Sequence, residues 1–98
     1  MNRNNSGIYN IDAVSKILAQ ETDSAALKNF MIEMLTKAEL ETLSKRWRIL
    51  EMLAAGRTQR AIAEELRVSL CKVTRGAHIL KNKNSIAAKY LIRRQKEQ

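Results

Sequence analysis

Apolar residues recur along most of the chain three or four positions apart, the spacing that places them on one side of an α-helix. Proline is absent, and no stretch keeps the alternation of apolar and polar residues that marks a strand. The pattern predicts six helices, at about residues 11–21, 24–34, 36–55, 59–66, 70–80 and 85–95. We therefore expect an all-α fold with a single helical domain over residues 11–98, preceded by a disordered, asparagine-rich tail at residues 1–10.

Residues typical of helix ends stand at several of the expected boundaries. Thr58 and Ser69 are placed to cap the fourth and fifth helices by accepting a backbone hydrogen bond. Thr36 and Glu39 have the spacing of a capping box at the start of the third helix. Gly56 suits the left-handed backbone that ends many helices, so we expect the third helix to stop there.

Residues 58–80 have the pattern of a helix-turn-helix, in which two short helices cross steeply through a tight turn. The crossing needs a small residue at the contact, and Ala63 can supply it. The apolar residues placed to fill the angle between the helices are Ile62, Leu66, Val68 and Val73. The exposed front of the second helix, the part that enters the major groove in DNA-binding proteins, would carry Leu70, Cys71, Thr74 and Arg75.

The turn of this motif lacks the glycine that many helix-turn-helix units use. Arg67 stands there instead, and a left-handed backbone at a residue with a side chain costs about 1 kcal/mol. The spacing favours a DNA-binding unit and leaves a structural helical hairpin as the alternative.

The chain is too short to bury a large core of its own. It has 98 residues, of which 45% are hydrophobic and only 4% aromatic. The third predicted helix has the most regular apolar face, formed by Leu40, Leu43, Trp47, Leu50 and Leu53. We expect a second copy to complete the core, which makes a homodimer the predicted state. No membrane-spanning run and no secretory leader is found, so the predicted location is cytoplasmic, without membrane association.

Positive charge is concentrated in the second part of the chain. Residues 1–40 hold four Lys/Arg and five Asp/Glu, a net charge of −1, whereas residues 41–98 hold fourteen and five, a net charge of +9. This asymmetry favours a polyanionic partner such as nucleic acid for the second part.

The segment Thr36–Lys81 resembles the long third helix and the helix-turn-helix of the tryptophan repressor family. The most specific matches are Thr-Gln-Arg at 58–60 and Thr-Arg-Gly at 74–76, and the six-helix layout extends the resemblance loosely over the rest. In that family the outer helices of two chains interlock into one core, from which two reading heads project. The resemblance implies an intertwined homodimer that acts as a sequence-specific repressor on a palindromic operator in double-stranded DNA.

The resemblance also implies which residues contact the DNA. Gln59 and Arg60, at the start of the motif, would contact phosphate and a guanine edge, with which arginine can form two hydrogen bonds. The residues that would face the groove are Leu70, Cys71, Thr74 and Arg75. Those that would contact the DNA backbone are Lys72, His78 and Lys81.

Members of the tryptophan repressor family bind a small amino-acid corepressor, L-tryptophan, between the third helix and the reading helix. Arg46 and Arg75 match the two arginines that hold it, and two guanidinium groups can stack on an indole and bind its carboxylate. Thr36 and Gly76 also match positions of that pocket. Ile79 stands where the family has a serine, so a repressor that works without a ligand remains an open alternative.

Two other functions fit the basic helices. One is the DNA-recognition subunit of a transposase. The other is an adaptor for RNA or an acidic protein, whose contact surface would be the last helix with Lys89, Arg93, Arg94 and Lys96. An enzyme is not expected, because Glu64 and Glu65 point to different sides of a helix and no phosphate-binding Gly-rich loop is present. One cysteine and one histidine also exclude a Cys/His zinc site within one chain.

Overall fold

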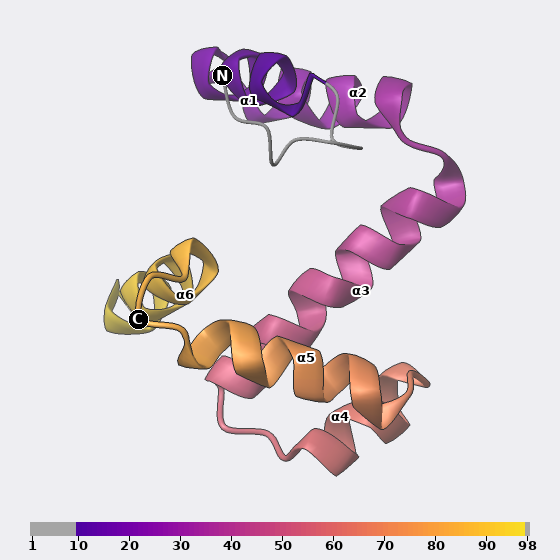
Figure 1. Cartoon of the computed structure of the whole chain (residues 1–98), viewed down its shortest axis with the longest axis vertical. Helices are drawn as coiled ribbons and strands as arrows, with labels where there is room; N and C mark the ends of the chain where they lie inside the picture. The colour runs from indigo at the N-terminus through magenta and orange to yellow at the C-terminus, as the bar shows by residue number, and fades with distance from the viewer. Residues whose placement is uncertain (1–9, 98) are drawn as a thin grey trace. The chain divides into compact units, whose positions relative to one another are not determined.

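The computed structural model describes residues 10–97, which form six α-helices and no strand. The helices are α1 (Ile11–Gln20), α2 (Ser24–Met34), α3 (Lys37–Ala54), α4 (Gln59–Leu66), α5 (Leu70–Lys81) and α6 (Ile86–Glu97) (Figure 1). The predicted all-α fold is confirmed, and the helix boundaries lie close to those expected from the pattern. The predicted disordered tail lies outside the described residues except for Asn10, which precedes α1.

The helices divide into two units. The first ends at Lys37 and contains α1 and α2, and the second begins at Ala38 and contains α4, α5, α6 and nearly all of α3. In the first unit, Asp23 caps α2 by accepting the N–H of Ala25 at 3.1 Å. Neither α1 nor α2 contains a buried residue, and Ile32 and Met34 are 50% and 60% exposed. The apolar faces of these two helices therefore form as predicted but are not covered within the unit.

The second unit has a small core where α3, α4 and α5 meet (Figure 1). Its buried members are Ile49, Met52, Ile62 and Val73. The half-buried residues packed against them are Leu53, Ala63, Leu66 and Val68. These two groups contain all the residues predicted to form the contact and fill the angle of the helix-turn-helix, so this part of the prediction is confirmed.

Gly76 allows α5 to lie close against α3. It is buried, and a β-carbon built there would lie 2.9 Å from Ile49 Cγ2, 3.2 Å from Leu53 Cδ1 and 3.3 Å from Leu50 Cδ2. The Ile49 methyl is attached to a branched carbon with restricted rotation, so it cannot easily move aside. The absence of a side chain at position 76 thus sets how closely the predicted reading helix approaches α3.

The end of α3 is a glycine-terminated Schellman motif. The backbone N–H of Gly56 donates to Leu53 O and that of Arg57 donates to Met52 O, each at 3.0 Å, with φ of Gly56 at 91°. Arg57 then binds Glu65 of α4, with 2.7 Å between Nη2 and Oε1. This hydrogen bond, together with the charge of Arg57, lowers the pKa of Glu65 below its ordinary value.

The predicted caps of the helix-turn-helix are present. The Thr58 hydroxyl accepts the N–H of Ala61 at 3.1 Å, and the Ser69 hydroxyl accepts the N–H of Lys72 at 3.3 Å. Both side chains satisfy backbone donors that the first turn of a helix leaves free. The first turn of α4 and the first turn of α5 are therefore each fixed by a local hydrogen bond.

Arg67 stands in the turn where many helix-turn-helix units have a glycine, and it adopts the left-handed conformation, with φ at 56° and ψ at 49°. The N–H groups of Arg67 and Val68 both donate to Ala63 O, so the conformation ends α4 in an ordered way.

We expect Arg67→Gly to raise the free energy of unfolding by about 0.5–1 kcal/mol, because relief of the backbone strain outweighs the greater freedom of the unfolded chain. Urea unfolding followed by circular dichroism measures this change. Arg48→Gly, within α3, should instead lower the stability, and a loss in both variants would refute the strain at Arg67.

Candidate nucleic-acid interface

Five of the nine residues predicted to contact DNA share one face of α5. They line a shallow depression formed by Leu70, Cys71, Thr74, Arg75 and His78. Their spacing of one, three and four positions places them on the same side of the helix. Leu70 is 49% exposed and Cys71 is a free, exposed thiol. The face offers apolar contact at its amino-terminal end, with hydroxyl, imidazole and guanidinium groups beyond.

A hydrogen bond connects this face to the start of α4. The Thr74 hydroxyl donates to Gln59 Oε1 at 2.8 Å, and both side chains are partly buried. The bond occupies the oxygen of the Gln59 amide, so the amide NH₂ group is the part left to donate to a phosphate. The sequence suggested a DNA contact for each residue separately, but it gave no sign that the two bind each other.

The Gln59–Thr74 bond can be tested by a double-mutant cycle with Gln59→Leu and Thr74→Val. We expect a coupling of about 1 kcal/mol in the free energy of unfolding, the typical net value of one such hydrogen bond. Urea unfolding of the four proteins gives this coupling. The cycle that combines Gln59→Leu with Thr42→Val, at an exposed threonine of α3, should be additive. Additivity in both cycles would mean that Gln59 and Thr74 do not support each other.

The remaining predicted DNA-binding residues occupy three different places. Arg60 is exposed in the first turn of α4, next to Gln59, and Lys81 is exposed in the last turn of α5. Lys72 is also exposed, but it lines a different part of the surface from the depression on α5. The structure thus groups most of the predicted residues around the front of α5 and separates Lys72 from them.

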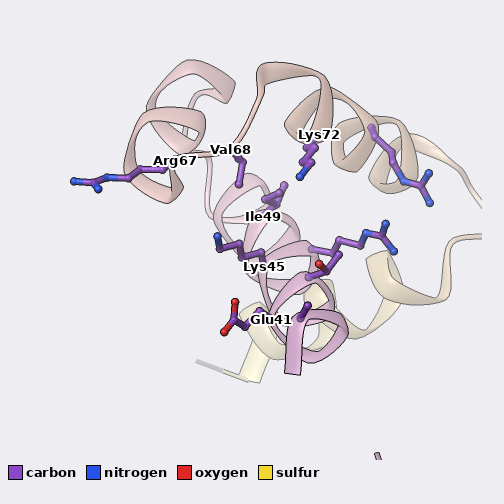
Figure 2. A pocket seen from close by; sticks show the side chains of 10 residues that line it. Glu41, Lys45, Ile49, Arg67, Val68 and Lys72 are labelled. Atoms are coloured by element: carbon purple, nitrogen blue, oxygen red, sulfur yellow. The ribbon is translucent and has the colours of Figure 1, made fainter. Parts of the chain in front are cut away.

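A cavity of about 320 Å³ lies between α3, the α4–α5 turn and α5. It is lined by Ala38, Glu41, Thr42, Lys45, Arg46, Ile49, Arg67, Val68, Lys72 and Arg75. Figure 2 shows Lys72 and Val68 pointing towards α3, where Ile49 lies, while the guanidinium of Arg67 points away. Arg46 and Arg75, predicted as a pair from the family resemblance, do line the same cavity.

The cavity lining is strongly cationic. It contains five basic residues, Lys45, Arg46, Arg67, Lys72 and Arg75, and one carboxylate, Glu41. Arg67 contributes only the base of its side chain, because its guanidinium points away, so four cations remain. The ion pairs Arg48–Glu51 and Arg57–Glu65 involve none of these six residues. The sequence assigned neither Glu41 nor Lys45 a role, and it assigned Arg67 only to the turn. The helical spacing of Glu41, Lys45 and Ile49, which places them on one side of α3, is a signal that could have revealed the first two.

Two other residues matched to the ligand pocket do not line this cavity. Gly76 is buried in the helix contact with Ile49, Leu50 and Leu53, because the close approach of α5 to α3 takes all the space at its α-carbon. Thr36 is exposed and belongs to the first unit.

In the described part of the chain, no group of three or more His, Cys, Asp or Glu residues could hold a metal ion. None of the helices described is both long and apolar enough to cross a membrane.

Comparison with known proteins identifies the family. A family model described as Trp repressor protein matches residues 9–96, nearly the whole chain. The chain belongs to the Trp repressor family. Trp operon repressor homologs from Xylella fastidiosa strains M23, Temecula1 and 9a5c are each 39% identical to it over 70 residues. The match covers 70% of this chain and 76% of each relative. No solved structure gives a significant match.

Membership of the Trp repressor family confirms the resemblance seen in the two sequence triplets. Proteins of this family are DNA-binding regulators of transcription and not enzymes, as the sequence analysis expected. The helix-turn-helix of this Trp repressor family member is formed by α4 and α5, and the cavity lies on the side of α5 that faces α3.

Proposed function

We propose that this chain represses transcription as a homodimer that binds a palindromic DNA operator, with α4 and α5 as the reading unit of each subunit. The observation that carries the proposal is the face of α5 lined by Leu70, Cys71, Thr74, Arg75 and His78. It lies in the part of the chain, residues 41–98, in which fourteen Lys/Arg stand against five Asp/Glu. An exposed helix face of this composition fits the major groove.

The residues of the reading unit divide into two roles. Leu70 and Thr74 are suited to base edges, since an apolar side chain can contact a thymine methyl and a hydroxyl can bond a base or a bridging water. Arg60 and Lys81, exposed on α4 and α5, are suited to phosphates. The Gln59–Thr74 hydrogen bond holds the start of α4 against α5, which fixes the two sets of contacts relative to each other.

The homodimer is supported by apolar surface that one chain leaves uncovered. On α3, Leu43 and Trp47 are 42% and 37% exposed, although they continue the predicted apolar face of that helix. On α6, Ile86, Tyr90 and Ile92 are 69%, 55% and 52% exposed. Together with α1 and α2, which have no buried residue, these helices need a second copy to cover them.

We expect Leu43→Ala to raise the dissociation constant of the homodimer about tenfold. The reason is the loss of about 1.4 kcal/mol of apolar burial at the contact between subunits. Sedimentation equilibrium measures the constant directly. Ser44→Ala, at the neighbouring exposed position of α3, should leave it unchanged. A monomeric wild-type protein, or equal constants for the wild type and Leu43→Ala, would contradict the proposed interface.

Selection of the preferred duplex from random-sequence DNA tests the operator proposal. We expect a palindrome whose half-sites are about 34 Å apart, one helical turn, because the dimer presents two reading units on one side of the DNA. Equal binding to all sequences would rule out a specific repressor. RNA that competes better than duplex DNA would support the adaptor hypothesis instead.

Control of the repressor by a small ligand is the second part of the proposal. Arg46 and Arg75 line one cavity beside α5, and the relatives are named after the trp operon, so L-tryptophan is the first ligand to test. Calorimetric titration should give one site per subunit that Arg46→Ala abolishes. The absence of any heat change with a correctly folded dimer would exclude tryptophan while leaving DNA binding intact.

A further inference from the structure

The charge of the cavity exceeds what a neutral zwitterion can balance. An amino acid such as tryptophan brings one carboxylate and one ammonium group, so it adds no net charge to a lining that, apart from the outward-pointing Arg67, has four cations and one carboxylate. Glu41 is the one carboxylate of the lining available to its ammonium, against four cations. Like charges gathered around one cavity repel, and a bound anion relieves that repulsion.

We propose that this cavity binds a small molecule with two or more negative charges, and that this anion weakens DNA binding. The ligand class is a phosphate ester or a polycarboxylate, because guanidinium and ammonium groups bind both through charge-assisted hydrogen bonds. The volume of about 320 Å³ suits a small metabolite, since ligand sites range over about 300–1,000 Å³. Val68 and Ile49 add an apolar wall on one side, where a non-charged part of the ligand can pack (Figure 2).

Arg75 determines the direction of the effect on DNA. It lines both the cavity and the depression on the front of α5, so it can serve either the anion or the DNA. An anion bound beside it also reduces the positive potential that attracts phosphates. Binding of the anion and of DNA is therefore antagonistic, and each lowers the affinity for the other by the same factor. This second step rests on the proposed function, whereas the anion site itself does not.

The anion site is tested by calorimetric titration of the intact protein with three probes: inorganic pyrophosphate, citrate and L-tryptophan. We expect pyrophosphate or citrate to bind at least tenfold more tightly than L-tryptophan, and the two anions distinguish a phosphate site from a carboxylate site. Lys45→Gln should weaken anion binding about fivefold, the effect of one charge about 4 Å away in water. Lys28→Gln, an exposed lysine of α2 outside the cavity, should not. L-Tryptophan binding most tightly, or equal anion affinity in Lys45→Gln and the wild type, would overturn the proposal.

The antagonism is tested with the duplex selected as the preferred site, at constant ionic strength adjusted with NaCl. We expect saturating anion to raise the dissociation constant for DNA at least fivefold in the wild type and in Lys28→Gln, but less in Lys45→Gln. An unchanged or lower constant in the wild type would overturn the antagonism. A protein that binds no DNA at all would refute the proposed function, and the calorimetric titration would still decide whether the anion site exists.

Discussion

Replacing Gly76 with valine is expected to lower the free energy of unfolding by about 3 kcal/mol. The first atom of any side chain at this position would already be 2.9 Å from the Ile49 Cγ2 methyl, and valine adds two further methyl groups. Overpacking of a filled helix contact costs about 1–3 kcal/mol or more, because neighbouring side chains must leave their preferred rotamers. Urea unfolding followed by circular dichroism measures the loss.

Cys71→Val is the matched control, since it places the same branched side chain on the exposed side of α5. It should change stability by no more than about 0.5 kcal/mol. Gly76→Ala should fall between the two, because the better helix propensity of alanine partly offsets the contact with Ile49. Equal stabilities of Gly76→Val and Cys71→Val would show that α5 does not pack closely on α3.

Arg75→Ala is expected to lower the affinity of the dimer for its preferred duplex about 100-fold. Arg75 lines the exposed face of α5, and hydrogen bonds to charged groups contribute about 1.5–3 kcal/mol each. A symmetric dimer loses the contact twice, so a total of about 3 kcal/mol is a conservative expectation. Fluorescence anisotropy with labelled duplex at fixed salt, without added anions, measures the two affinities.

Arg48→Ala removes the same charge from the exposed side of α3, where Arg48 binds Glu51 at 3.4 Å. Because it lines neither the cavity nor the α5 depression, we expect a loss of less than threefold. If the two variants bind DNA equally well, then Arg75 contributes only to the general positive charge, and the front of α5 is not the reading surface.

The features that the sequence predicted correctly are set by local interactions. The caps at Thr58 and Ser69 and the end of α3 at Gly56 depend on hydrogen bonds between residues a few positions apart. The left-handed conformation of Arg67 follows from its place in the short turn, where many helix-turn-helix units have a glycine. The burial of Ile62 and Val73 follows from helical periodicity combined with a steep crossing. Each of these could be inferred from residue type and spacing alone.

The features that were missed depend on how the helices pack. The hydrogen bond between Gln59 and Thr74 joins residues fifteen positions apart, and no periodicity reveals it. Gly76 matched a ligand-pocket residue in sequence, yet its position against Ile49 gives it a packing role. Lys72 was expected to contact the DNA backbone, and the sequence gave no sign that its side chain also lines the cavity (Figure 2). Predicting these features requires the angle at which α5 crosses α3 and the closeness of their contact, and the sequence pattern gives neither.

The position of Arg75 on two adjoining surfaces constrains how this protein can diverge. A substitution selected because it suits a new operator would also alter the cavity, and one selected for a new effector would alter the reading face. Under the two proposals above, a change of target genes would come together with a change of the sensed molecule, because both contacts would depend on Arg75.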